Sequence, residues 1–419
     1  MQKLRVRGPV SLHGEVAISG AKNAALPILL ATILCDGPVV LHNVPLLRDT
    51  TTVLALLTKL GARVVMHEQG AVEIDTSTLQ HFAADYDLVK TMRASVLVLG
   101  PLLAKYYEAY VSLPGGCAIG SRPVDLHLRG LGQLGADITL HDGYIDAQSK
   151  GRLQGAVVDM PVISVGATEN ILMAATLAEG TTILSGAATE PEVIDLANFL
   201  VTMGAKIQGI GTSCMTIEGV KALQGGEYTV IPDRVEAGTY LIAAAMTRGS
   251  VRVDQVVPED LSMLCELLQQ AGAEIVREEK AIELDMQGRM PRAVSISTAP
   301  FPGFPTDLQA QWLAMATVSE GVAQIEETVF ENRFMHVQEL CRMGAKIELN
   351  GRVATVTGKP YLSGAQVMAT DLRASASLVL AGLVAQGDTL IDRIYHIDRG
   401  YAFLEEKFGA LGATIERVS

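Results

Sequence analysis

The stretch VIDLANFLVTMGAKI, residues 193–207, joins a helical pattern of apolar side chains to a Met-Gly-Ala ending. Apolar residues at i, i+3, i+4 and i+7 predict an amphipathic helix, and a glycine suits the left-handed residue that ends one. The alternating residues that follow predict a β-hairpin. The same pattern occurs six times in the 419 residues, with its glycines at positions 61, 135, 204, 272, 344 and 412.

The glycines are 74, 69, 68, 72 and 68 residues apart, which predicts six repeats of one unit. A Leu-Gly-Ala ending is common in helices, but its near-constant spacing and a second shared helix argue against coincidence. That second helix is apolar nearly all round, which predicts burial. Its six copies occupy residues 23–37, 90–106, 168–180, 236–249, 307–321 and 372–387.

Two helices and three or four strands per repeat predict an α/β protein of roughly 70-residue units. Six such units could close into one ring or form two domains of three units, each of ordinary size. The segment GGEYTVIPDR, near residue 230, marks the midpoint of the chain.

The composition and the motifs narrow the range of possible functions. A net charge of −13 argues against general nucleic-acid binding, although a local basic cluster could still hold small anions. We see no signal peptide and no apolar run of membrane-spanning length, so we expect a soluble cytoplasmic protein. There is no metal-ligand motif, phosphate-binding loop or dinucleotide fingerprint, so we expect neither a metal nor a cofactor. Four cysteines are far apart in the sequence, and we interpret them as small core residues: Cys35, Cys214, Cys265 and Cys341.

Polar residues gather where the buried helices begin. Capping accounts for Ser164 and Asp371, because serine and aspartate are common N-cap residues. It does not account for Lys22, Arg93 and Arg373, because a cation at a helix start opposes the helix dipole. We therefore predict that an anion lies among these cations.

Cys117 lies in VSLPGGCAIGSRPVD, residues 111–125, a glycine-rich loop that could close over a substrate. Backbone amides and Arg122 could activate the thiol, which makes Cys117 a catalytic candidate. The alternative is a surface thiol on a flexible turn. For Arg333 and His336 in ENRFMHV, and for Arg393, His396 and Arg399 further on, surface salt bridges are the default interpretation.

Several strings together resemble the UDP-N-acetylglucosamine enolpyruvyl transferases, from the N-terminus to about residue 417. They are SGAKNAALPILLA, YDLVKTMRAS, LPGGCAIGSRPVDLH, PFPGFPTDLQAQ, ETVFENRFMHV, GAQVMATDLRASASLVLAG and YHIDRGY. The resemblance implies an inside-out α/β barrel of two domains, with three repeats in each. One domain would span residues 21–230, and the other residues 1–20 and 231–419, so that the first strand joins the C-terminal domain.

The resemblance also implies a reaction. Phosphoenolpyruvate and UDP-N-acetylglucosamine, the two implied partners, would give the enolpyruvyl ether at the sugar 3-hydroxyl plus phosphate, by addition and then elimination. This is the first committed step of peptidoglycan synthesis. Family members are fosfomycin targets, and we expect a monomer without membrane or nucleic-acid partners.

Residue roles follow by position in the motifs. Cys117 matches the cysteine that protonates the methylene carbon and can form a covalent adduct, and Asp307 matches the base for the sugar hydroxyl. Lys22, Arg122 and Arg399 match the phosphate clamp. Arg373 matches a carboxylate-side group, and Asn23 contacts the intermediate. The implied UDP-sugar contacts are Arg93, Arg122, Pro123, Val124, Asp125, Leu126, Ser164, Val165 and Val329.

One position departs from the pattern: Val162 stands where some relatives carry lysine, which removes a charged contact to the diphosphate. Two rival functions remain. A 5-enolpyruvylshikimate-3-phosphate synthase-like enzyme would share the fold and the phosphoenolpyruvate chemistry, but the PGGC loop and the Arg-Pro-Val-Asp-Leu run favour the UDP-sugar. A non-catalytic UDP-sugar-binding paralogue would not need the full set of Lys22, Cys117, Asp307, Arg373 and Arg399.

Overall fold

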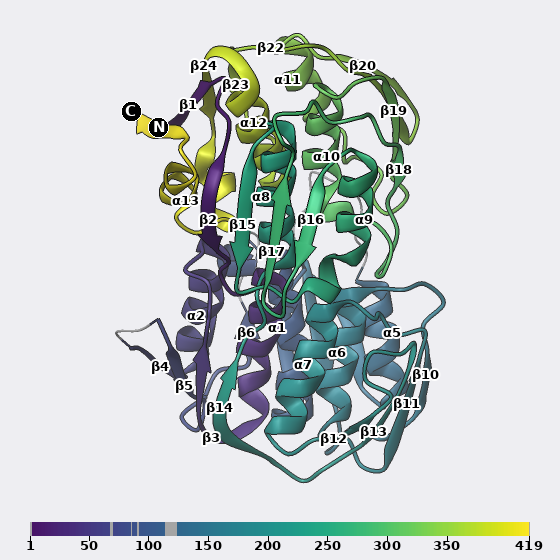
Figure 1. Ribbon diagram of the computed structural model, residues 1–419. Coiled ribbons are helices and arrows are strands. Elements are labelled where there is room, and N and C mark those ends of the chain that lie inside the picture. The colour runs from purple at the N-terminus through teal and green to yellow at the C-terminus, as the bar shows by residue number, and fades with distance from the viewer. Residues whose placement is uncertain (1, 68–69, 85, 90–91, 114–123, 419) are drawn as a thin grey trace. The chain divides into compact units, whose positions relative to one another are not determined.

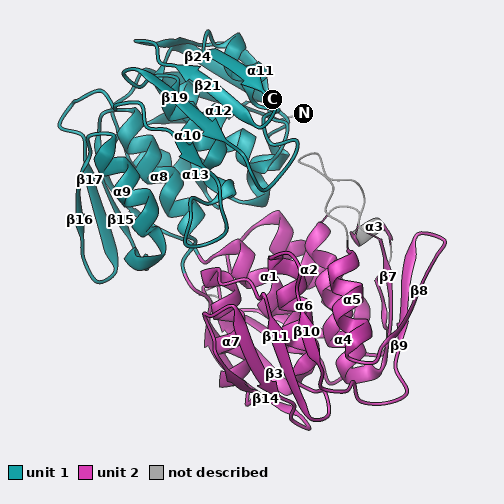
Figure 2. Cartoon of the chain, turned by 90° about the vertical axis from the view of Figure 1, so that its right-hand side faces the viewer, with its two compact units in different colours: residues 1–19, 117–121, 232–419 teal, residues 20–116, 122–231 magenta. Residues whose placement is uncertain are grey.

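The computed structural model describes the chain apart from residues 1, 68–69, 85, 90–91, 114–123 and 419 (Figure 1). The described residues form two compact units, shown in different colours in Figure 2. Unit 1 contains the described parts of residues 1–19 and 232–419, and unit 2 contains those of residues 20–116 and 122–231.

Unit 2 holds three four-stranded sheets of one design among its described residues. In each, a central strand pairs in parallel with one neighbour and antiparallel with one strand of a hairpin. The three sheets are β14(Leu223–Thr229)-β3(Cys35–His42)-β5(Val72–Asp75)-β4(Arg63–Met66), β6(Ala83–Ala84)-β7(Glu108–Ser112)-β9(Tyr144–Gln148)-β8(Asp137–His141) and β10(Val157–Asp159)-β11(Thr181–Ser185)-β13(Cys214–Glu218)-β12(Lys206–Gln208).

Unit 1 repeats this design with strands from both ends of the chain. The N-terminal β2 pairs in parallel with β15, and β1 pairs antiparallel with both β24 and β25. The sheets are β2(His13–Ala17)-β15(Ser250–Asp254)-β17(Ala281–Asp285)-β16(Glu274–Arg277), β18(Ile296–Ser297)-β19(Val322–Glu326)-β21(Val353–Thr357)-β20(Lys346–Asn350) and β22(Leu362–Ser363)-β24(Ala385–Asp392)-β1(Lys3–Gly8)-β25(Thr414–Val418), with β23(Gln366–Met368) also on β24.

Two kinds of helix connect these strands, as the repeat predicts. One kind is nearly all buried and fills the core of each unit: α1(Lys22–Ala31), α4(Leu99–Tyr106) and α6(Val165–Ala175) in unit 2, and α8(Arg234–Met246), α10(Gln309–Ala316) and α12(Leu372–Val384) in unit 1. The other kind is amphipathic: α2(Arg48–Leu60), α5(Asp125–Gln133), α7(Pro191–Thr202), α9(Ser262–Gln270), α11(Val337–Arg342) and α13(Leu404–Ala410).

The predicted helix ends are confirmed, because all six repeat glycines have positive φ angles between 89° and 109°. L-amino acids rarely adopt this backbone conformation, which explains the glycine in each copy. A β-hairpin follows in five copies, also as predicted. In the sixth copy β25 pairs with β1 instead.

The buried helix of the second repeat differs from its prediction. Instead of one helix over residues 90–106, the described part holds α3(Tyr86–Val89), the 3₁₀ helix η2(Arg93–Val98) and then α4. Pro101 has no backbone N–H to donate to the carbonyl of Leu97, so one α-helical hydrogen bond is missing where η2 passes into α4. Arg93 consequently begins η2 rather than a long helix.

The cysteine prediction is partly wrong. Cys35 and Cys265 are buried, but Cys214 and Cys341 are exposed. Cys214 is an end residue of β13, and Cys341 lies on the outer face of the short helix α11. Alternating or helical patterns place a side chain on one face of an element but do not show which face is covered. Within the described residues, no helix is long and apolar enough to cross a membrane.

Candidate active site

The starts of two buried helices in unit 1, α10 and α12, meet at Asp307. This residue lies in the 3₁₀ turn η4(Thr306–Leu308) that leads into α10. One carboxylate oxygen accepts a hydrogen bond from Arg333 at 2.6 Å, and the other accepts one from Arg373 at 2.8 Å. Both arginines are 4% exposed. The predicted gathering of charged groups at matching helix starts is thus confirmed for Asp307 and Arg373.

Arg373 is held from several sides. Asp371 caps α12, because its side chain accepts the backbone N–H groups of Arg373 and Ala374 at 2.8 and 3.0 Å. The guanidinium lies 5.9 Å from the ring centre of the buried Tyr401. Burial alone would lower the pKa of Arg373, but Asp307, Tyr401 and Asp233 together more than offset this and raise it. The site therefore holds a fixed, permanently charged cation.

Tyr401 belongs to a buried hydrogen-bond network behind this cation. Its hydroxyl lies 2.9 Å from the Thr239 hydroxyl and accepts a hydrogen bond from Gln311 at 3.2 Å. Thr239 lies on α8 and Gln311 on α10, so the network ties together the same helices whose starts carry the charged groups. Burial raises the pKa of Tyr401, and the charge of Arg373 acts in the opposite direction.

A buried carboxylate, Glu327, supports the other side of the cluster. It is fully buried, accepts hydrogen bonds from Thr298 and Thr306 at 3.0 and 2.8 Å, and accepts the backbone N–H groups of Val329 and Phe330 at 2.8 and 3.0 Å. Thr306 in turn accepts a hydrogen bond from Arg333 at 2.9 Å. The predicted contact residue Val329, itself exposed, is therefore coupled to the Asp307 cluster through one carboxylate.

Arg333 is the main site residue that sequence reasoning missed, because a surface salt bridge was its default interpretation. That interpretation is wrong: Arg333 and His336 are 4% and 1% exposed. A signal was available in the sequence, since Arg333 and His336 alternate with the apolar Phe334, Met335 and Val337. The guanidinium also lies 5.1 Å from the ring centre of Phe330.

His336 should make the stability of the protein depend on pH. Burial lowers its pKa from 6.5 to about 4, with Asp371 acting against this and Arg333 adding to it. The unfolded chain thus takes up a proton at higher pH than the folded chain. The resulting stability is complete above about pH 6.5 and is lost as the pH falls towards about 4, by about 3 kcal/mol in total.

This expectation can be checked with urea unfolding at several pH values. Between neutral pH and about pH 4.5, the wild type should lose about 2–3 kcal/mol more unfolding free energy than His336→Phe. His13→Phe, which alters an exposed histidine of the same unit, is the control. Equal pH dependence of the wild type and His336→Phe would contradict the expectation.

In unit 2, Lys22 is the first residue of α1 and is 9% exposed. Its ammonium group lies 3.5 Å from the carboxylate of Asp49, a buried residue in the first turn of α2. Asn23, the next residue of α1, is half-buried. A carboxylate thus pairs with the predicted phosphate ligand at a helix start.

The predicted nucleotide-sugar contacts of unit 2 also lie at helix starts. Arg93 begins η2, Val124 precedes α5, and Asp125 and Leu126 form its first turn. Ser164 caps α6 by accepting the N–H of Ala167 at 3.3 Å, which confirms the capping interpretation, and Val165 begins that helix. Val162, at the position of the missing lysine, is 64% exposed. Cys117, Arg122 and Pro123 lie outside the described residues.

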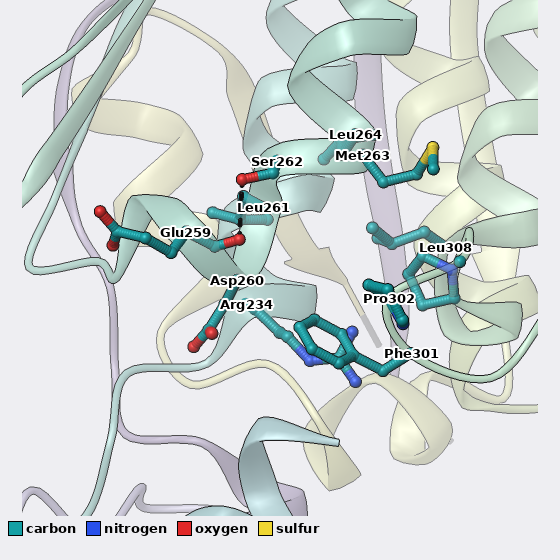
Figure 3. A pocket seen from close by; sticks show the side chains of 12 residues that line it. Arg234, Glu259, Asp260, Leu261, Ser262, Met263, Leu264, Phe301, Pro302 and Leu308 are labelled. Atoms are coloured by element: carbon teal, nitrogen blue, oxygen red, sulfur yellow. Dashed lines mark hydrogen bonds between the residues drawn. The ribbon is translucent and has the colours of Figure 1, made fainter. Parts of the chain in front are cut away.

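Unit 1 also contains the predicted phosphate ligand Arg399 and a small pocket. Arg399 ends the 3₁₀ helix η5(Ile394–Arg399) and is half-buried. A small pocket lies beside η4, where the Arg234 guanidinium faces the ring of Phe301 at 5.7 Å (Figure 3). Leu308 lines this pocket, but Asp307 and Arg373 do not.

Among the described residues, no cluster of three or more His, Cys, Asp or Glu side chains could hold a metal ion.

The sequence is similar to that of known carboxyvinyltransferases. The chain matches the EPSP synthase (3-phosphoshikimate 1-carboxyvinyltransferase) family over residues 6–408. It is 59% identical to the UDP-N-acetylglucosamine 1-carboxyvinyltransferases of Coxiella burnetii strains Dugway 5J108-111 and RSA 493, over 100% of this chain and 96% of theirs.

Solved structures agree with the fold expected from the sequence. The enolpyruvyl transferase NikO from Streptomyces tendae superposes with a TM-score of 0.89 at 25% identity, covering 100% of this chain and 99% of NikO. EPSP synthase from Acinetobacter baumannii gives 0.78 at 19% identity over 100% of both chains, a likeness of fold alone. The predicted two-domain α/β fold is thereby confirmed. The chain belongs to the EPSP synthase (3-phosphoshikimate 1-carboxyvinyltransferase) family and is a carboxyvinyltransferase.

Proposed function

We propose that the protein transfers the enolpyruvyl group of phosphoenolpyruvate to the 3-hydroxyl of UDP-N-acetylglucosamine and releases phosphate. Relatives that share 59% of its residues over the whole chain carry the name of this activity. The observation in the structure that carries the proposal is the Asp307 carboxylate held between two buried arginines. This pairs a base with cations suited to an anionic substrate.

The first step is an addition. Asp307 takes the proton of the sugar 3-hydroxyl, whose oxygen then forms a bond to C2 of phosphoenolpyruvate. The double-bond electrons take up a proton at the methylene carbon, and we assign this acid role to Cys117. The product is a tetrahedral ketal that still carries the phosphate. Preorganised cations lower the cost of the charge that develops in such a step.

The substrate carboxylate competes with Asp307 for the guanidinium groups of Arg333 and Arg373. When it occupies one of them, an oxygen of Asp307 becomes available to accept the sugar proton. Elimination then removes a proton from the methyl carbon, restores the double bond and breaks the bond to phosphate. Lys22, Arg122 and Arg399 stabilise the leaving phosphate, and Asn23 holds the intermediate.

Nucleotide-sugar binding falls to the starts of η2, α5 and α6 in unit 2, together with Arg122, Pro123 and Val329. The exposed Val162 leaves the diphosphate without a lysine contact at that position. By the same proposal, the protein acts in the cytoplasm at the first committed step of bacterial peptidoglycan synthesis. Cell-wall growth and division depend on that pathway.

A coupled phosphate-release assay tests the reaction. Phosphate should appear only when phosphoenolpyruvate and UDP-N-acetylglucosamine are both present. Release with shikimate 3-phosphate in place of the UDP-sugar would establish the rival synthase activity instead. Binding of the UDP-sugar without any phosphate release would favour the non-catalytic paralogue.

Covalent labelling tests the role of Cys117 separately. Fosfomycin should inactivate the enzyme and add its mass to the peptide that contains Cys117, more slowly when UDP-N-acetylglucosamine is left out. Cys214→Ser, which removes an exposed thiol elsewhere, should be labelled like the wild type. An unlabelled Cys117 in an active enzyme would contradict the assignment of the acid.

A further inference from the structure

One buried side chain links the three helices of unit 2, η2, α5 and α6, whose starts carry predicted nucleotide-sugar contacts. Asn170 lies on α6 and is fully buried. Its side-chain amide donates to the carbonyl of Val96 on η2 at 3.2 Å and lies 3.0 Å from Nδ1 of His127 on α5. Its side-chain oxygen accepts the N–H of Gly100 on α4 at 2.7 Å.

These partners fix which way the amide points. The Gly100 N–H can only donate, so the side-chain oxygen of Asn170 must face it. The Val96 carbonyl can only accept, so the NH₂ group must face that side. A flipped amide would place two donors together at Gly100 and two acceptors together at Val96. The NH₂ group consequently also faces His127.

The orientation of the amide decides the protonation of His127. Because Asn170 donates to Nδ1, that nitrogen must be an acceptor and cannot carry a proton. The ring is therefore neutral, with its proton on Nε2. Burial lowers the pKa of His127 to about 4, and the charge of Arg93 acts in the same direction while Asp125 opposes it.

The protonated edge of the ring faces the start of α6. A Cβ atom added to Gly166 would lie 3.3 Å from Cε1 and 3.5 Å from Nε2 of His127. Gly166 follows Ser164 and Val165 in the first turn of that helix. The close fit continues at Gly100, where an added Cβ would lie 2.4 Å from the backbone oxygen of Asn170. Only glycine lets α4 and α6 approach so closely.

We propose that Asn170 is a positioning residue for nucleotide-sugar binding: it joins η2, α5 and α6 and fixes His127 as the Nε2–H tautomer, a donor beside the first turn of α6. The inference rests on the proposed function, because it assigns the nucleotide-sugar to these helix starts. Because the pKa of His127 is lowered to about 4, the ring stays neutral at neutral and mildly acidic pH.

The first measurement uses the wild-type protein without substrates. Long-range ¹H–¹⁵N correlation spectra of ¹⁵N-histidine-labelled protein should show His127 with an unprotonated Nδ1 and a protonated Nε2, unchanged across neutral and mildly acidic pH. His127→Phe identifies the signal. A proton on Nδ1 would overturn the proposal, whatever reaction the protein catalyses.

The second measurement is calorimetric binding of UDP-N-acetylglucosamine. Asn170→Asp sets a carboxylate against Nδ1 and the Val96 carbonyl, which should move the proton to Nδ1 and weaken binding roughly 10- to 100-fold. The KM for phosphoenolpyruvate should not change. Thr176→Val is the control, since it alters a buried hydroxyl of the same region whose hydrogen bond is local to α6. Equal affinity of Asn170→Asp and the wild type would overturn the proposal.

Should Asn170→Asp fail to fold, substitutions of His127 decide the matter. His127→Gln retains a donor at the ε position and should bind more tightly than His127→Leu, and equal loss in both would exclude a donor role. If the wild type binds no UDP-N-acetylglucosamine, the proposed function fails. The histidine spectra then still decide whether Asn170 fixes the tautomer.

Discussion

Replacement of Asp307 by asparagine is expected to lower kcat roughly 10²- to 10⁴-fold while leaving the binding of phosphoenolpyruvate intact. The variant keeps the shape of the side chain but cannot take a proton from the sugar hydroxyl. It also removes the negative charge between Arg333 and Arg373, which contact Asp307 at 2.6 and 2.8 Å. Both guanidinium groups are then more available to the substrate carboxylate.

This prediction separates catalysis from binding. Steady-state phosphate release gives kcat, and calorimetry gives the dissociation constant for phosphoenolpyruvate, which should stay the same or decrease. Asp254→Asn serves as the matched control, because it disturbs an ion pair with Arg252 on β15 of the same unit. A large loss of phosphoenolpyruvate affinity in Asp307→Asn would show that the carboxylate organises the arginines rather than acting as the base.

Replacement of Lys22 by methionine should lower kcat by roughly 10²- to 10³-fold, the effect of removing one preorganised group that stabilises transition-state charge. In the proposed reaction its ammonium group faces the leaving phosphate. Lys22→Arg keeps the charge and the pairing with Asp49, but a planar guanidinium does not reproduce a compact ammonium, so partial activity is expected. Phosphate release under saturating substrates measures both.

A double substitution distinguishes lost chemistry from lost stability. Lys22→Met leaves the buried Asp49 without the cation at 3.5 Å, so some loss of unfolding free energy is expected. Lys22→Met combined with Asp49→Asn should recover stability but not activity. Lys105→Met is the control, since Lys105 pairs with Asp36 in the same unit and takes no part in the proposed reaction. Recovery of activity in the double variant would contradict the role of Lys22.

Local patterns predicted the repeated architecture well. Helix periodicity, a glycine at each helix end and alternating hairpins depend on neighbouring residues, so they can be read directly from the chain. The same holds for caps such as Ser164 and Asp371, whose partners lie two or three residues away. Cations at helix starts pointed to an anion site for a similar local reason. The roles of individual residues in that site came from the resemblance alone.

What the tertiary structure decided involves residues far apart in the chain. The pairing of β1 with β25 joins residues about 400 positions apart, and no local pattern specifies such a partner. Arg333 and Asp307 are 26 residues apart, and Arg373 and Asp307 are 66 apart. The fold joins these three side chains into one buried charged cluster, whereas the sequence suggested a surface pair for Arg333 and gave no sign that it joins Asp307 and Arg373.

Asn170 shows most clearly the difference between what the sequence predicts and what the fold decides. In the sequence it is one polar residue in an apolar helix, without a motif that marks it. In the fold, its three polar contacts come from η2, α4 and α5, and the direction of each donor and acceptor leaves His127 one neutral tautomer. Its apolar composition alone predicted that this helix would be buried. The protonation of a histidine beside it depended on hydrogen-bond directions that exist only once the helices have packed.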